Sequence, residues 1–259
     1  MKKLNTILAF ATIMLSAYYF YFQAPRSDTD TITNKNVLVV GISPDYPPYA
    51  QIDLETGKVV GLEVDIITEI AHRLDKTLQI KDMPFNSLII ELISGQIDVI
   101  AAGLCPTPER KKNILFSTSY IDNDENIVIS KKENPEITDL QDLYGKPVAV
   151  NIGYTADTFL SNYPQIELVR LKSPADGFMA LQTNSVYGFA IAQSIFNNFI
   201  KKHHQADDYN FFYLPASTDA CALAYAKYSS KLQAEIDPII QQMIEDGTMQ
   251  TIKKKWGFA

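Results

Sequence analysis

The sequence has few cysteines, few histidines and no surplus of basic residues, and each shortage excludes a class of function. Cys105 and Cys221 are the only cysteines among 259 residues, and there are three histidines. None of these five residues has the spacing of a zinc site, so we expect no metal centre and no cofactor. The formal net charge is −7. This argues against a nucleic-acid partner, because nucleic-acid binders normally carry a basic patch or a high isoelectric point.

Residues 1–25 have the pattern of a targeting segment. Lys2 and Lys3 precede a largely apolar run over residues 4–22, and a polar linker follows over residues 26–36. The run is about as long as a membrane-spanning helix and ends in bulky aromatic residues, so the sequence leaves open a cleaved signal peptide or a retained anchor. The segment contains no cysteine, which excludes a lipoprotein anchor. With no second apolar span, we expect an exported, periplasmic or otherwise extracytoplasmic protein, either soluble or tethered.

Strands and helices alternate after the linker. The patterns predict strands over residues 37–43, 78–83 and 97–104, a helix over residues 61–74, and a short helix capped by Asn86 and stopped by Gly95. The longer helix has an apolar face made of Leu62, Ile66, Ile67, Ile70, Ala71 and Leu74. This βαβαβ order predicts a parallel sheet with right-handed crossovers.

The pattern then restarts in a second α/β unit. Strands are predicted within residues 142–153, 167–171 and 187–192, with helices that begin at Thr155 and at Ser173-Pro174. Residues 125–130 form a strand between the two units. The tail contains one more strand, residues 220–227, and a long helix that Pro238 should kink or break.

One tail strand and two helices are too few for a third domain, so we expect the tail to complete the first unit. Lobe 1 then comprises residues 37–124 and 221–259, and lobe 2 comprises residues 125–220. The chain crosses twice between the lobes and forms a hinge. Because ligands of open α/β sheets lie at the carboxyl ends of the strands, we expect a binding cleft between the lobes.

Arg110 lies where a helix normally disfavours a cation. Thr107 is a good N-cap and Pro108 is favoured at the first helical position, which places Arg110 in the first turn. Free backbone N–H groups at this turn would attract an anion, and a guanidinium adds a two-pronged donor that matches a carboxylate. The alternative is a surface arginine paired with Glu109 or Asp122. These residues alone leave both interpretations open.

Five segments, in order along the chain, resemble the polar amino-acid-binding proteins of ABC importers. They are GISPDYPPYA, GLEVDIITEIAHRL, PFNSLIIELISGQIDVIAAGLCPTPERKKNILFS, DLYGKPVAVNIGYTADTFL and IEDGTMQTIKKKWG. The resemblance covers about residues 37–257 and is closest to the arginine-binding branch. It implies the α/β, two-lobed type II periplasmic-binding-protein fold, with two doubly wound sheets joined by a two-strand hinge that closes over a ligand. The implied partner is an ABC permease, and we expect a monomer.

The resemblance also assigns binding residues in both lobes. The carboxylate-binding arginine of the family falls on Arg110, and the residues before it that hold the same carboxylate fall on Gly103 and Cys105. Cys105 stands where serine or threonine is usual, and a thiol is a weaker donor. Two aromatic residues that sandwich the ligand side chain fall on Tyr46 and Phe85. Phe85 has the alternative role of a core residue at the start of its helix.

In the second lobe, the glycine–threonine turn of the family falls on Gly153 and Thr155. The family threonine meets the ligand carboxylate from the far side, which couples binding to closure of the lobes. Thr155 has the alternative role of a helix N-cap.

The largest departure from the family concerns the ligand ammonium. The aspartate that usually holds it falls on Ala192, which is followed by Gln193, and a second family acid falls on Ser43, with Asp45 two residues later. A buried ammonium without a carboxylate is costly. Either Asp45 or another acid substitutes, or the ligand is a carboxylate without an α-ammonium group; the sequence leaves both open.

We therefore expect an extracytoplasmic solute-binding protein, not an enzyme, that delivers a small carboxylate-bearing solute, a polar or basic amino acid, to an ABC permease. A dehydratase of the cyclohexadienyl type shares the fold but needs a general acid in the cleft, where Ala192 and Gln193 offer none. A sensor would require a second membrane span or a cytoplasmic module, and the sequence shows neither. Cys105 and Cys221 are either bridged, which would limit closure, or free thiols.

Overall fold

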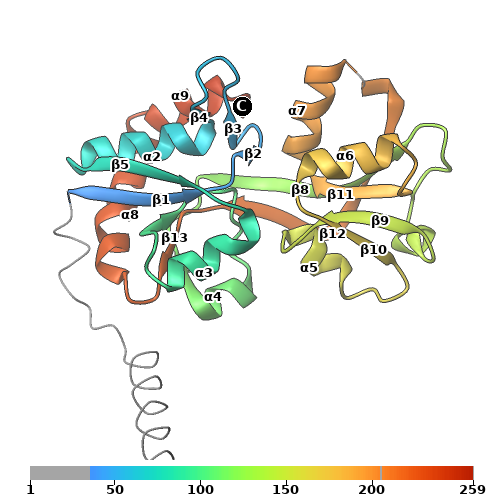
Figure 1. Cartoon of the computed structure of the whole chain (residues 1–259), viewed down its shortest axis with the longest axis horizontal. Helices are drawn as coiled ribbons and strands as arrows, with labels where there is room; N and C mark the ends of the chain where they lie inside the picture. The colour runs from blue at the N-terminus through green and yellow to red at the C-terminus, as the bar shows by residue number, and fades with distance from the viewer. Residues whose placement is uncertain (1–35, 205, 259) are drawn as a thin grey trace, which may run out of the picture. The chain divides into compact units, whose positions relative to one another are not determined.

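The computed structural model describes residues 36–204 and 206–258, without the side chains of Asn123, Ala206 and residues 216–219. The predicted targeting segment and nearly all of the linker lie outside the described residues. Within the described part of the chain, two five-stranded sheets and one three-stranded sheet form, as Figure 1 shows. We call the elements of the first five-stranded sheet, with the helices that pack on it, lobe 1, and those of the second lobe 2.

Lobe 1 is a mixed sheet in the order β5-β1-β6-β13-β7. Its strands are β1 (Val37–Ile42), β5 (Thr77–Asp82), β6 (Val99–Ile100), β7 (Ile114–Phe116) and β13 (Ala224–Ala226). Its helices are α2 (Leu62–Arg73), α3 (Leu88–Ile93), α4 (Pro108–Asn113), α8 (Ser230–Glu245) and α9 (Thr248–Lys255), with a 3-10 turn η1 (Phe85–Ser87). A small antiparallel sheet contains β2 (Asp45–Tyr46), β3 (Ala50–Ile52) and β4 (Val59–Val60). Strand β13 lies between β6 and β7, so the tail returns to lobe 1 as expected.

Lobe 2 has the strand order β10-β9-β11-β8-β12. Its strands are β8 (Ile121–Lys131), β9 (Pro147–Asn151), β10 (Glu167–Leu171), β11 (Gly188–Ala192) and β12 (Tyr209–Cys221). Its helices are α5 (Thr155–Leu160), α6 (Pro174–Gln182) and α7 (Gln193–His203), with 3-10 turns η2 (Leu140–Leu143) and η3 (Ala206–Asp208). Strands β8 and β12 pair antiparallel over most of their length and connect the two lobes (Figure 1).

Three local expectations are wrong. Asn86 caps no helix: it lies in η1, and α3 begins at Leu88. The strand expected over residues 97–104 pairs only over β6, because the chain then turns into a loop in which Gly103 has a φ of +60°. Residues 220–227 are not one strand but the end of β12 followed by β13, since main-chain bonds at Ala222 and Leu223 go to lobe 1 segments.

Of the two effects expected of Pro238, a kink or a break, the structure excludes the break. Helix α8 runs from Ser230 to Glu245 with Pro238 inside it. Proline removes one helical hydrogen bond, but both flanking turns are held by buried apolar side chains, so packing outweighs the local cost. These side chains are Leu232, Ile236, Ile239, Ile240 and Met243.

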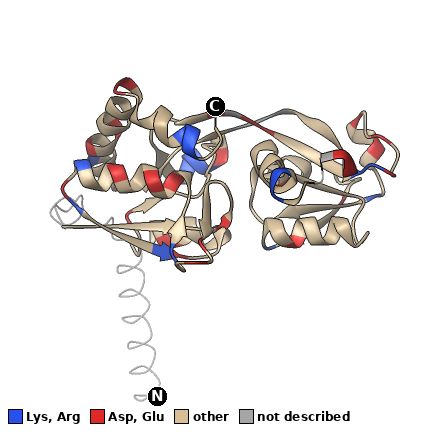
Figure 2. Ribbon diagram, turned by 90° about the horizontal axis from the view of Figure 1, so that it is seen from above, with Lys and Arg blue, Asp and Glu red and all other residues tan. Residues whose placement is uncertain are grey.

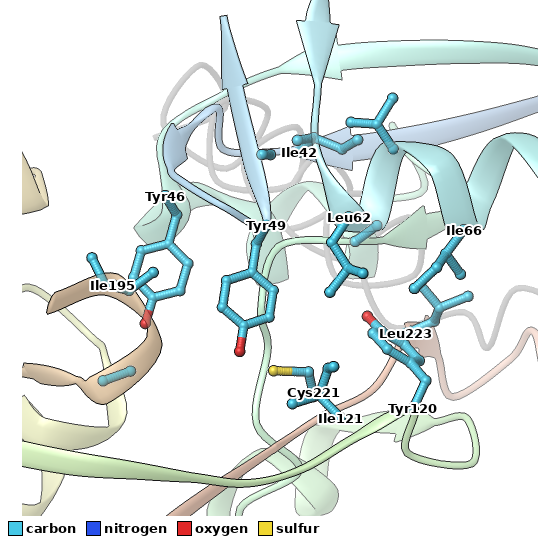
Figure 3. Close-up of a cluster of buried hydrophobic side chains, with 14 of the residues drawn as sticks. Ile42, Tyr46, Tyr49, Leu62, Ile66, Tyr120, Ile121, Ile195, Cys221 and Leu223 are labelled. Atoms are coloured by element: carbon cyan, nitrogen blue, oxygen red, sulfur yellow. The ribbon is translucent and has the colours of Figure 1, made fainter. Parts of the chain in front are cut away.

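The main hydrophobic core extends across both lobes near the hinge. Tyr49, Tyr120 and Tyr225 are among its largest fully buried side chains. Figure 3 shows Tyr46 and Tyr49 projecting from the small sheet of lobe 1, with Cys221 at the end of β12 below Tyr49 and Ile195 of lobe 2 beside Tyr46. Of the two aromatic residues that the sequence assigns to the ligand site, Tyr46 therefore belongs to the core and Phe85 packs against it.

Gly61 lies against the backbone of Tyr49, and this close approach gives a testable prediction. Its φ is +152°, and a Cβ atom there would lie 2.1 Å from the carbonyl oxygen of Tyr49. Because the clash is with backbone, we expect Gly61→Ala to lower the free energy of unfolding in urea by about 3 kcal/mol or more. Gly57→Ala is the matched control: its φ is +66° with nothing within 4 Å, and it should cost only about 1 kcal/mol. Equal losses in the two variants would contradict this explanation.

Candidate functional site

Five of the ten residues that the sequence assigns to the ligand site line a small space between the lobes, which we call the inner cavity. It has a volume of about 10 Å³. Its walls are Tyr46, Phe85, Gly103 and Arg110 from lobe 1 and Asn126, Tyr154, Thr155, Ala156, Ala190, Ile191 and Ala192 from lobe 2. Phe85 also borders a wider space of about 530 Å³, the outer cavity, which includes Ser43, Asp45 and Asp82 of lobe 1 and Lys172 of lobe 2.

Arg110 connects the two lobes across the inner cavity. The predicted cap of its helix is confirmed, because the Thr107 hydroxyl accepts from the Arg110 backbone N–H at 3.2 Å. The guanidinium donates through Nη1 to the carbonyl oxygen of Cys105 and through Nη2 to that of Gly153, both at 2.8 Å. Its Cζ lies 5.7 Å from the centre of the Phe85 ring. A planar donor thus faces oxygen atoms from both lobes.

Tyr154 fills the space between the predicted aromatic residues. Its ring centre lies 4.2 Å from that of Phe85 and 5.2 Å from that of Tyr46. The side chain is buried, and its hydroxyl oxygen has no hydrogen-bond partner. Burial raises the pKa of Tyr154 well above its usual value, so the phenol is neutral. Sequence reasoning missed this residue, although it is the middle residue of the Gly153–Thr155 turn.

Tyr154, not Thr155, is the N-cap residue of α5, so the alternative interpretation of Thr155 as a cap is wrong. Thr155 is instead the first helical residue and lines the inner cavity. Tyr154 is the cap residue because its backbone is extended, and its side chain makes no capping hydrogen bond. Thr155 is therefore positioned to face the cleft.

Gly103 and Glu63 form an interaction that sequence reasoning did not find. The backbone N–H of Gly103 donates to Oε2 of Glu63 at 2.6 Å, and the Tyr120 hydroxyl donates to Oε1 of the same carboxylate. Glu63 is fully buried, and burial raises its pKa from 4.5 to about 7 against the opposing effect of these two hydrogen bonds. The available signal was its spacing, because Glu63 shares the apolar helix face of Ile66, Ile67 and Ile70.

Ser43 and Asp45 border the outer rather than the inner cavity. The Ser43 hydroxyl donates to Oδ1 of Asp45 at 2.7 Å, and burial raises the pKa of the Asp45 carboxyl above its ordinary value. The Asp45 carboxyl therefore borders the same outer cavity as Phe85.

Gln193 and Cys105 do not line the inner cavity. Gln193 lies at the start of α7, where its Nε2 donates to the Tyr213 hydroxyl at 2.9 Å, and it lines a different cavity of about 360 Å³. Cys105 is buried and contributes its carbonyl oxygen to Arg110. Cys105 and Cys221 are both buried and form no disulfide, so the bridged alternative is not formed.

Asp124 joins the lobes on the hinge side. Its carboxylate accepts from the Tyr49 hydroxyl of lobe 1 at 2.7 Å and from the backbone N–H and hydroxyl of Ser194 in lobe 2 at 3.0 and 2.6 Å. It is buried and lies at the N-terminus of α7, where the helix dipole favours an anion. The donors around Asp124 therefore come from both lobes.

Acidic and basic residues are interspersed along the elements of both lobes, as Figure 2 shows.

Within residues 36–204 and 206–258, no three His, Cys, Asp or Glu side chains come together in a way that could hold a metal ion. No helix in that part of the chain is long and apolar enough to cross a bilayer.

Comparison with known proteins agrees with this geometry. Residues 38–259 match the family of bacterial extracellular solute-binding proteins, family 3. The arginine-binding extracellular protein ArtP of Bacillus subtilis is 30% identical over 244 residues, which cover 89% of each chain. An ancestral arginine-binding protein solved with arginine has a TM-score of 0.80 at 29% identity, over 86% of this chain and 99% of that one.

An ancestral arginine-binding protein solved with glutamine also has a TM-score of 0.80 at 29% identity, over 87% of this chain and 99% of the other. These similarities confirm the predicted two-lobed type II periplasmic-binding-protein fold and the resemblance to amino-acid-binding proteins of ABC transporters. The chain belongs to family 3 of the bacterial extracellular solute-binding proteins.

Proposed function

We propose that the protein captures a small carboxylate-bearing solute, of the size of an amino acid, between its lobes and delivers it to an ABC permease. The observation that carries the proposal is the Arg110 guanidinium, which lies at the inner cavity and donates to main-chain oxygens of both lobes. A ligand carboxylate offers the same guanidinium two stronger, charged acceptors. Carboxylate binding at this point would bridge the lobes.

Binding then acts by population shift. A ligand that touches both lobes stabilises the closed form by its differential affinity for the closed and open forms. Arg110 and Phe85 would hold it from lobe 1, and Thr155 and the Gly153 turn from lobe 2. The proposed boundaries are residues 37–124 and 221–259 for lobe 1 and residues 125–220 for lobe 2, with β8 and β12 as the hinge.

The names of the relatives support the solute class. ArtP is called an arginine-binding protein, and ancestral arginine-binding proteins were solved with arginine and with glutamine. We infer an amino acid or a close carboxylate relative as the ligand, and export through the targeting segment over residues 1–25. We infer no catalysis, because the inner cavity is lined by one guanidinium, two phenols and neutral groups, without a carboxyl or imidazole for acid–base chemistry.

The test is a binding screen of the full-length chain, kept in mild detergent because of its apolar residues 4–22. Melting temperature is measured with each of the twenty amino acids and with simple mono- and dicarboxylates. A ligand at 100 times its Kd should stabilise the native state by about 3 kcal/mol, which raises the melting temperature by several degrees. The absence of a shift with every carboxylate would contradict the proposed function.

Tyr154 gives a second prediction, because its ring occupies the space that a ligand side chain needs. A cavity of about 10 Å³ holds roughly one water molecule, so the ligand must displace the ring. The ring is held without a hydrogen bond at its hydroxyl. We expect Tyr154→Ser to bind the screened ligand about 10-fold more tightly by isothermal titration calorimetry, since the cost of displacement is removed. Tyr144→Ser, at an exposed tyrosine of the same lobe, is the control, and weaker binding by Tyr154→Ser would refute the displacement.

A further inference from the structure

We propose that the inner cavity recognises a carboxylate whose α-carbon carries no ammonium group. A deaminated carboxylate would then bind at least as tightly as the amino acid with the same side chain. This inference rests on the proposed function, because it concerns the ligand of the same cavity.

The wall of the inner cavity contains one charged side chain, that of Arg110. The other ionisable groups in this wall are the phenols of Tyr46 and Tyr154. An α-ammonium group is one carbon away from the carboxylate, so a carboxylate held at Arg110 would bring the ammonium into this cavity. The ammonium would lie near a guanidinium with no carboxylate in the cavity wall. Burying a cation without such a partner is costly.

The part of the cavity wall that lobe 2 contributes includes Ala192 and Asn126. Ala192 of β11 pairs directly with Asn126 of β8, and both residues are buried. Ala192 offers a methyl group. Asn126 offers a neutral amide, whose oxygen accepts a hydrogen bond but does not neutralise a cation. This wall accommodates a neutral α-carbon better than an ammonium.

Three buried acids outside the wall of the inner cavity already have donors. Glu63 accepts from Gly103 and Tyr120. Asp124 accepts from Tyr49 and Ser194. Asp157 accepts from the Gly153 N–H at 3.0 Å and from the Arg170 guanidinium at 2.9 Å.

Asp45 and Asp82 border the outer cavity, not the inner one whose wall holds Arg110. The Asp45 carboxyl accepts from the Ser43 hydroxyl. We infer from this placement that these two acids meet the far end of a ligand rather than a group one carbon from its carboxylate. None of the acids named here lies in the wall of the inner cavity beside Arg110.

The test compares matched pairs of ligands on the full-length wild-type chain by isothermal titration calorimetry. The pairs are L-arginine with 5-guanidinopentanoate, L-glutamine with 5-amino-5-oxopentanoate, and L-phenylalanine with 3-phenylpropanoate. In every pair that binds, we expect the Kd of the deaminated member to equal or fall below that of the amino acid.

An amino acid that binds about 10-fold or more tightly than its deaminated partner would overturn the inference and leave the proposed function intact. Failure of every member of every pair, and of the wider carboxylate screen, would overturn both. The two failures are therefore distinguishable.

A gain-of-function variant tests the same point from the opposite direction. Ala192→Asp places a carboxylate in the cavity wall, where it can form a charge-assisted hydrogen bond with an ammonium. We expect the preference for the amino acid over its deaminated partner to increase about 10-fold or more in this variant. Ala192→Asn has the same shape without the charge and should leave the preference unchanged. If Ala192→Asp leaves the preference unchanged as well, the α-ammonium is not near Ala192 and the inference fails.

Discussion

Replacement of Arg110 with alanine is expected to weaken binding of the carboxylate ligand about 100-fold or more. The guanidinium is the one charged group in the wall of the inner cavity, and its two donors already face oxygen atoms of both lobes at 2.8 Å. Charge-assisted hydrogen bonds in a water-poor site are worth more than neutral ones, and Arg110→Ala removes two of them together with the neutralising charge. Calorimetric titration of the full-length variant with the ligand from the screen measures the loss.

Two further variants separate a direct contact from a loss of structure. Lys111→Ala removes a positive charge from the exposed face of the same helix and should leave the Kd unchanged. Arg110→Lys keeps the charge but loses the planar, two-pronged geometry, and it should bind with an intermediate affinity. The melting temperature of ligand-free Arg110→Ala should change little, because Arg110 is only partly buried. Unchanged ligand affinity in Arg110→Ala would remove the basis of the proposed function.

The regular elements with clear periodicity could be predicted from the sequence. Helix α2 has an apolar face, α6 begins at a capping box of Ser173 and Asp176, and α4 begins at Thr107, and each signal is local. The site residues that such a local motif presents, Arg110 and Thr155, also lie at the predicted cleft.

Strand β12 could not be predicted by the same means, because its stability comes from a distant partner. Pro215 interrupts its sequence pattern, and proline normally argues against a strand. The structure accommodates it because β12 is an edge strand with an irregular register between Tyr213 and Thr218. The whole element depends on pairing with β8, whose paired residues lie between 78 (Tyr209 with Lys131) and 100 (Cys221 with Ile121) positions earlier in the chain, and no local signal reports that pairing.

Tyr154 and Glu63 could not be predicted for a related reason. Tyr154 was passed over because its side chain contacts Phe85 and Tyr46, which are far away in sequence, and only the folded chain brings these rings together. Glu63 was not predicted because the role of a lone acid on an apolar helix face depends on its hydrogen-bond partners, here Gly103 and Tyr120, which are distant in sequence. Sequence patterns report helix faces and caps, whereas the walls of this cavity come from both lobes.

Glu63 gives the prediction with the second large effect, which concerns the pH dependence of stability. Its pKa is about 7 in the folded protein and close to 4.5 when the chain is unfolded. Below about pH 4.5 the carboxyl is protonated in both states, and above about pH 7 it is ionised in both. Between these values the folded chain holds a proton that the unfolded chain has lost, so stability falls as the pH rises through this window.

The pKa difference corresponds to a loss of about 3 kcal/mol in the free energy of unfolding, from below pH 4.5 to above pH 7. Glu63→Gln removes the titration but keeps an oxygen for the Gly103 N–H and a donor for the Tyr120 oxygen. We expect wild type to lose about 3 kcal/mol relative to Glu63→Gln between pH 4.5 and pH 8. Urea unfolding of both full-length proteins at steps across this range measures the difference. Glu55→Gln, at an exposed site, corrects for the general effect of removing one negative charge.

The sign of the difference discriminates between the two forces on Glu63. Its two hydrogen bonds stabilise the ionised form and lower the pKa, whereas burial destabilises that form and raises it. If burial is the larger effect, as the structure indicates, wild type loses stability relative to Glu63→Gln as the pH rises. If the donors from Gly103 and Tyr120 dominate instead, wild type gains stability over the same range, and the carboxylate is a charged anchor for the Gly103 loop. In that case the loop beside Arg110 would be held by an ion at neutral pH, and Glu63→Gln would weaken ligand binding there as well as stability.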